Sequence, residues 1–312
     1  MSSLSPKPRK PGIFGNPAAL FAVIVAILVA LSVAHHSHAA TPYPDVTTER
    51  FSVSVSGDGP DVVLIPGLGS SAAVWDGTVA RFKGHYRLHV LNLAGFAGEP
   101  AGANAAGNVI APSVEALDGY IRANHLQHPI IVGHSMGGLM ALMLAKAHPE
   151  DTGKLVIVDA LPFVGLIFDP NATVAGLMPQ AAAMRDGMMA TPADAFAAQQ
   201  KQGTARLVSK PGDIDTVTGW SVASDRRVFA QSFFDDLTTD LRADLATLKT
   251  PAVVIVPVAS QYGQTADAAL GTYRAAYAGM PAVSFVPVDA SLHFVMLDQP
   301  EPFAVALEGA LK

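Results

Sequence analysis

The sequence predicts an α/β fold: a doubly wound, mostly parallel β-sheet flanked by helices, with an inserted helical cap. Short continuous runs of apolar and β-branched residues, typical of strands buried on both faces, alternate with longer Ala- and Leu-rich segments. This alternation stops between about residues 161 and 250, where the composition is helical. The chain has 312 residues and half of them are hydrophobic, which is enough for one large core.

The expected elements follow from this alternation. Seven strands are predicted, at Phe51–Val55, Val62–Ile65, Tyr86–Leu91, Ile130–Val132, Leu155–Val158, Ala252–Val258 and Val283–Val286. The helices predicted in the sheet domain are Ser113–Asn124, Met136–His148, Ala266–Ala278 and Pro302–Leu311. The cap, residues 161–250, is expected to end in a return helix near Asp240–Leu248. Its four methionines, Met178, Met184, Met188 and Met189, are expected to serve ordinary core packing, and an adaptable apolar binding surface is the alternative.

The first 39 residues differ from the rest and are typical of a secretory signal peptide. Basic residues precede an uncharged apolar run at residues 18–34, and Ser37-His38-Ala39 fits a small-x-small cleavage site. Cleavage would leave residues 40–312 as the folded domain of an exported protein, periplasmic or secreted. The alternative is an uncleaved membrane anchor through residues 18–34, the one part of the chain from which membrane contact is expected.

Composition excludes several classes of function. The chain contains no cysteine, which excludes disulfides, a thiol nucleophile and cysteine-based metal sites. Only 15% of the residues are charged, with no acidic or basic blocks, which argues against disorder. The formal net charge is −6, so nucleic acid is not expected as a partner.

The strongest functional signal is the run from Ile130 to Gly138, Ile-Ile-Val-Gly-His-Ser-Met-Gly-Gly. A buried-strand pattern leads into Gly-x-Ser-x-Gly, and good helix sequence follows. In such a sharp strand-to-helix turn, Gly133 and Gly137 must lack side chains for the turn to close. The turn places the Ser135 hydroxyl at a helix N-terminus, where the dipole favours a developing anion. The pattern therefore predicts Ser135 as a nucleophile.

On this motif and on the segment Leu64–Ser71, the chain resembles the α/β-hydrolase superfamily from about Phe51 to the C-terminus. The segment is similar to the family's loop after its third strand. The resemblance implies that the backbone N–H groups of Leu68 and Met136 form an oxyanion hole. Many relatives have His-Gly where this chain has Pro-Gly at positions 66 and 67, but a backbone donor does not depend on that side chain. The other interpretation of this segment is a simple Gly-rich turn.

The resemblance also implies a histidine base and an orienting acid. His293 follows the last predicted strand and precedes the C-terminal helix, where the family keeps its base, which can shuttle the serine proton. Most relatives carry the acid just after the strand predicted at Ala252–Val258, but residues 258–263 contain no carboxylate. Asp159, which follows the strand after the nucleophile, is the first choice and keeps the order nucleophile, acid, histidine. Asp225, Asp267 or no carboxylate at all are the alternatives.

These residues favour hydrolysis of a carboxylic ester through an acyl-serine intermediate, with no metal or organic cofactor. The apolar cap favours a small-molecule ester with a hydrophobic acyl or alcohol group as the partner. Lactone, amide or carbon–carbon bond hydrolysis and transacylation would use the same machinery. A non-catalytic binding protein of the same fold is the alternative from another class. The sequence does not indicate an oligomeric state.

Overall fold

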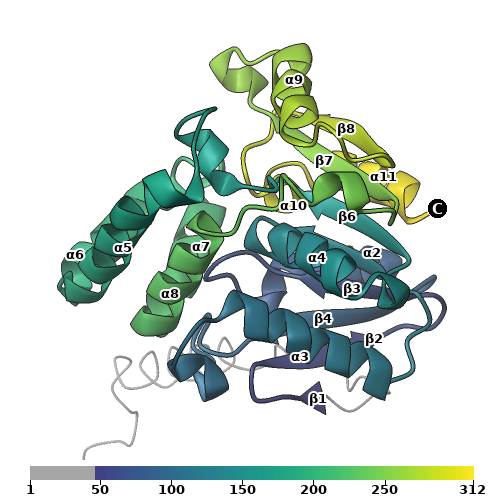
Figure 1. The fold of residues 1–312 in the computed structure, drawn as a ribbon, viewed down its shortest axis with the longest axis horizontal. Helices are drawn as coiled ribbons and strands as arrows, with labels where there is room; N and C mark the ends of the chain where they lie inside the picture. The colour runs from purple at the N-terminus through teal and green to yellow at the C-terminus, as the bar shows by residue number, and fades with distance from the viewer. Residues whose placement is uncertain (1–45) are drawn as a thin grey trace, which may run out of the picture. The chain divides into compact units, whose positions relative to one another are not determined.

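A computed structural model describes residues 46–312; the predicted signal peptide (1–39) and its alternative, the anchor (18–34), lie outside these residues. Eight strands form one sheet in the order β1-β2-β4-β3-β5-β6-β7-β8 (Figure 1). Their bounds are β1 Val46–Thr47, β2 Phe51–Ser56, β3 Asp61–Ile65, β4 Arg87–Leu93, β5 Ile130–His134, β6 Lys154–Val158, β7 Ala252–Val258 and β8 Val283–Asp289. Neighbours from β4 to β8 run parallel, whereas β1–β2 and β2–β4 are antiparallel. The predicted mostly parallel sheet is confirmed.

Helices cover both faces of this sheet. Those in the sheet domain are α2 (Asp76–Phe82), α3 (Ile110–Ala123), α4 (Met136–Ala147), α9 (Ala266–Ala276) and α11 (Pro300–Leu311). Buried residues of α3, α4 and α9 share one hydrophobic cluster, and those of α2 and α11 share another. The two clusters include alternate residues of the same strands, as expected for strands buried on both faces. The doubly wound architecture is therefore also confirmed.

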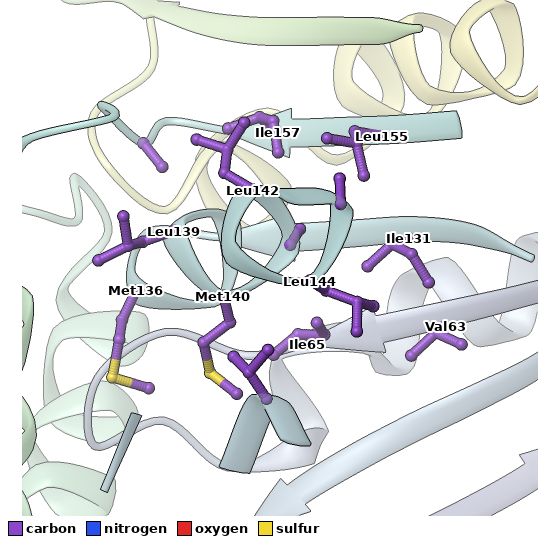
Figure 2. Packing of buried hydrophobic residues seen from close by; sticks show 14 of the residues in the cluster. Val63, Ile65, Ile131, Met136, Leu139, Met140, Leu142, Leu144, Leu155 and Ile157 are labelled. Carbon is purple, nitrogen blue, oxygen red and sulfur yellow. The ribbon is translucent and has the colours of Figure 1, made fainter. Parts of the chain in front are cut away.

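Helix α4 is the central helix of the first cluster. Its apolar residues occur all round the helix, which is typical of a helix surrounded by protein. Figure 2 shows Leu139, Met140, Leu142 and Leu144 of this helix above side chains of β3, β5 and β6. This packing fixes the position of the residue that precedes the helix, Ser135.

Four helices occupy the segment expected to form the cap, and they lie to one side of the sheet domain in Figure 1. They are α5 (Val174–Ala190), α6 (Ala193–Thr204), α7 (Pro211–Ala223) and α8 (Arg226–Leu237). Among residues 46–312, none of the helices is both long and apolar enough to cross a lipid bilayer.

Two expectations about this segment are wrong. In place of a return helix near Asp240–Leu248 there is only a short 3-10 helix, η5 (Leu245–Thr247). The Asp240 carboxylate accepts hydrogen bonds from the Arg242 backbone and guanidinium groups, a local arrangement that competes with helix formation. The methionines of α5 do not form a core either, because Met178 and Met189 are 39% and 49% exposed and Ala181 is the only buried residue of that helix.

Candidate active site

Ser135 lies at the turn between β5 and α4, and its backbone is held at φ 53° and ψ −123°. A positive φ is uncommon for a residue with a side chain and is maintained only where the surroundings enforce it. Here the surroundings are two close backbone approaches. A Cβ at Gly133 would lie 2.1 Å from the Gly137 carbonyl oxygen, and one at Gly137 would lie 2.4 Å from the Ile65 carbonyl oxygen. The motif thus folds as a tight elbow because both positions lack a side chain.

The loop after β3 lies directly against this elbow. A Cβ added at Gly67 would lie 3.2 Å from the Ser135 Cβ, and Gly67 begins a turn closed by the Ser70 N–H. Leu68 lies inside that turn, and Met136 is the first residue of α4, where backbone N–H groups have no acceptor within the helix. The chain crosses from one side of the sheet to the other between β4 and β5, so this loop and the elbow meet at the topological switch point beside β3.

His293 and Asp159 form a direct contact. The Nδ1 atom of His293, in the loop between β8 and α10 (Val295–Asp298), lies 2.7 Å from Oδ2 of Asp159 at the end of β6. The Tyr273 hydroxyl of α9 donates a hydrogen bond to the other carboxylate oxygen, Oδ1. Burial raises the pKa of Asp159, but the charge of His293 and the hydrogen bonds from His293 and Tyr273 outweigh burial and lower it. The carboxylate is therefore held ionised beside the imidazole.

The alternative acids lie elsewhere. The Asp225 carboxylate caps α8 by accepting a hydrogen bond of 2.9 Å from the Val228 N–H. Asp267 is exposed in the first turn of α9. The structure therefore brings His293 together with Asp159 and assigns a structural contact to Asp225.

His134, inside the elbow motif, supports the histidine loop. Its Nε2 lies 3.0 Å from the backbone carbonyl oxygen of His293, and the two imidazole centroids are 4.6 Å apart. Burial, with a smaller effect of His293, lowers the pKa of His134 to about 3, so this ring is neutral. Because a carbonyl can only accept, Nε2 carries the proton and donates. No local sequence pattern indicates this contact, because it joins residues 159 positions apart.

The histidine loop is also bound to the segment between α6 and α7. One oxygen of the buried Asp298 accepts a hydrogen bond of 2.8 Å from the Leu292 N–H. The other oxygen accepts from both the backbone N–H and the hydroxyl of Ser209. The Phe294 N–H donates to the Leu207 carbonyl at 3.1 Å. The residues on both sides of His293 are therefore fixed by the 207–209 segment.

A cavity with two arms lies around Ser135 and His293. One arm, of about 330 Å³, extends past Asp159 and Tyr273 toward α9. The other, of about 360 Å³, extends past Leu68 toward α6, α7 and α8. The two arms share Ser135, Val164, Ile167, Leu207, Asp236 and His293. Ile167 and Leu207 are 68% and 39% exposed, so apolar side chains that reach solvent also line the cavity. A separate cavity of about 470 Å³ between α2 and α11 contains none of these residues.

Within the described part of the chain, no three His, Asp or Glu side chains are grouped closely enough to bind a metal ion.

A strained serine elbow, a histidine held by a carboxylate and a glycine-containing turn against the elbow are typical of serine hydrolases built on an α/β sheet. The model of the alpha/beta hydrolase family matches residues 62–306, and the chain belongs to this family. The resemblance stated from the motifs is thereby confirmed.

Individual relatives match shorter segments. The chain is 37% identical to the pimeloyl-[acyl-carrier protein] methyl ester esterase of Vibrio vulnificus (strain YJ016) over 124 residues, 40% of this chain and 44% of that protein. It is 31% identical to the putative carbamate hydrolase RutD of Yersinia enterocolitica over 101 residues, 32% of this chain and 36% of that protein. The alignments therefore span less than half the length of these curated relatives.

Solved structures match over most of the chain. An enol-lactonase from Burkholderia xenovorans LB400 superimposes with a TM-score of 0.69 at 18% identity, covering 86% of this chain and 99% of the other. A thermophilic esterase from Thermogutta terrifontis gives a TM-score of 0.69 at 18% identity, with 86% and 98% covered. At these identities the similarity concerns the fold.

The elbow geometry predicts that Gly133→Ala is strongly destabilising. The new methyl group would overlap the backbone carbonyl of Gly137, so the free energy of unfolding should fall by about 1–3 kcal/mol or more. Gly271→Ala in α9 is the matched control, because the space there is open and alanine favours a helix by about 0.5–1 kcal/mol. Chemical denaturation of both variants measures the difference. Equal stabilities would contradict the description of the elbow.

The Tyr273–Asp159 hydrogen bond should appear as energetic coupling. In a double-mutant cycle of Tyr273→Phe and Asp159→Ala, we expect a coupling free energy of about 0.5–3 kcal/mol in unfolding experiments. Tyr277→Phe provides the control, because the Tyr277 hydroxyl donates to the Ala160 backbone carbonyl at 2.9 Å. A coupling for Tyr273 no larger than that for Tyr277 would show that the contact contributes nothing.

Proposed function

We propose that this protein hydrolyses a carboxylic ester through an acyl-serine intermediate, with Ser135, His293 and Asp159 as the catalytic triad. One observation carries the proposal. The Asp159 carboxylate lies 2.7 Å from Nδ1 of His293, while His293 and Ser135 line the same cavity. With Nδ1 bonded to the acid, Nε2 is the ring nitrogen that remains for the serine hydroxyl. The relatives named as methyl ester esterases support ester cleavage as the reaction class.

The first half of the reaction forms the acyl-enzyme. The Ser135 oxygen attacks the ester carbonyl carbon while Nε2 of His293 takes the hydroxyl proton. The carbonyl oxygen gains the negative charge of the tetrahedral intermediate and accepts hydrogen bonds from the Leu68 and Met136 amides. The carbon–oxygen bond to the alcohol then breaks, and His293 gives its proton to the departing alcohol.

In the second half, a water molecule replaces the alcohol. His293 removes a proton from the water as the water oxygen attacks the acyl carbon. Collapse of the second tetrahedral intermediate releases the carboxylic acid and returns the proton to Ser135. Asp159 keeps the imidazole in the tautomer with Nε2 free, and its negative charge stabilises the imidazolium formed in both halves. The steps consume only ester and water.

The shape of the cavity supports a small-molecule ester as the substrate. Two arms meet at Ser135, which suits an acyl group in one arm and an alcohol group in the other. Leu139, Leu161, Val164 and Phe229 are among the apolar residues that line the arms, so hydrophobic substituents are favoured. From the N-terminal sequence alone we further propose that the protein is exported, or anchored if residues 18–34 are retained.

The proposal predicts turnover of simple esters that depends on Ser135. The mature protein should hydrolyse a p-nitrophenyl ester series from acetate to palmitate, with a chain-length optimum that reflects the cavity. Ser135→Ala should abolish the activity, and an alkyl fluorophosphonate should label wild type but not this variant. Absence of both turnover and labelling would favour a non-catalytic binding protein.

The assignment of Asp159 as the acid of the proposed triad can be tested separately. Replacing the carboxylate with an amide favours the wrong histidine tautomer, so Asp159→Asn should lower kcat by about 10³–10⁴-fold with little change in KM. Asp225→Asn and Asp267→Asn serve as controls and should stay close to wild type, because their carboxylates lie in or beside helix N-termini. A near-normal Asp159→Asn enzyme would remove Asp159 from the mechanism.

A further inference from the structure

Contacts on two faces of helix α8 fix its orientation about its own axis. The Asp235 carboxylate accepts hydrogen bonds from the Val109 and Ile110 N–H groups at 2.6 and 3.1 Å, at the start of α3. On another face of the helix, Phe229 packs so closely on the loop after β3 that a Cβ at Gly69 would lie 2.6 Å from its ring. The orientation of the next residue, Asp236, is therefore fixed as well.

Asp236 is placed at the junction of the two arms. It lines both arms together with Ser135 and His293. Within residues 46–312, its carboxylate forms no side-chain hydrogen bond or ion pair. Asp159, the other acidic residue of the cavity, is bonded to His293 and Tyr273. Among the described residues that line the arms there is no lysine or arginine.

Asp236 is half-buried, and no lysine or arginine among the described residues of the arms provides its carboxylate with a counter-ion. Burial raises the pKa of Asp236 to about 7; the charge of His293 partly offsets this, and Asp235 adds to it. Four aromatic side chains line the second arm together with Asp236, those of Phe168, Phe229, Phe233 and Phe294. A ligand with a protonated amine would complete the ion pair and lie against aromatic rings.

We propose that Asp236 is a specificity-determining residue that selects esters carrying a protonated amine a few atoms from the scissile bond. This inference rests on the proposed ester hydrolysis and names the substrate class within it. The alkyl parts of such a substrate occupy the apolar arms, and the ammonium group donates a hydrogen bond to the Asp236 carboxylate. The negative charge of Asp236 disfavours esters with a carboxylate at that position, because the described residues of the arms include no lysine or arginine.

An isosteric pair of esters tests the proposal. 2-(Dimethylamino)ethyl butyrate carries a protonated amine near neutral pH, and 3-methylbutyl butyrate replaces the nitrogen with carbon. At one fixed pH, wild type should show kcat/KM about 10- to 100-fold higher for the amine ester, the range expected for a hydrogen bond between charged groups. In Asp236→Asn the ratio of the two kcat/KM values should fall to about one.

The control is Asp194→Asn, which removes an exposed carboxylate of α6 and changes the net charge equally. This variant should keep the wild-type ratio. A wild-type ratio at or below one, or a ratio that Asp236→Asn leaves unchanged, would overturn the inference while leaving ester hydrolysis intact. If neither ester is cleaved and Ser135 resists phosphonate labelling, the proposed function fails and the inference fails with it.

Discussion

The whole site depends on the close contact between the start of α4 and the end of β3. No side chain separates Gly137 from the Ile65 carbonyl, and a Cβ there would be only 2.4 Å from that oxygen. The contact holds Ser135 at its positive φ and keeps the loop after β3 against the elbow. Because both features depend on this backbone approach, the Ser135 hydroxyl and the amides of Leu68 and Met136 are positioned together.

The position of the acid follows from the geometry of adjacent strand ends. The Ser135 N–H donates to the Val158 carbonyl, so the elbow is joined to the end of β6, and Asp159 is the next residue. The Ser291 N–H donates to the Val258 carbonyl, which joins the histidine loop to the end of β7. Either strand end can therefore bring a carboxylate to His293. In this chain β6 does so, and α9 supplies the second hydrogen bond through Tyr273.

Much of the fold and of the candidate site is predictable from local sequence. The parallel strands appear as short apolar runs, and the Gly-x-Ser-x-Gly pattern locates the elbow because its chemistry is confined to five neighbouring residues. Tyr273, Asp236 and the contact of His134 with the histidine loop carry no such signal. Each depends on how a helix or loop is rotated against a distant part of the chain. The exposure of the α5 methionines is not predictable from the sequence for the same reason, since composition does not reveal which face of a helix packs against another element.

The cap and the proposed triad are not independent parts of the molecule. Asp298 binds Ser209 and the Leu292 N–H at the same time, and Leu207 both lines the cavity and accepts a hydrogen bond from Phe294. A substitution in the 207–209 segment that reshapes the cavity therefore also acts on the residues flanking His293. Asp236 is different, because α8 is fixed through Asp235 to the start of α3 rather than to the histidine loop. If Asp236 has the proposed role, a substitution in α8 can change the cavity without breaking a hydrogen bond of the histidine loop, whereas a change at the 207–209 segment affects both.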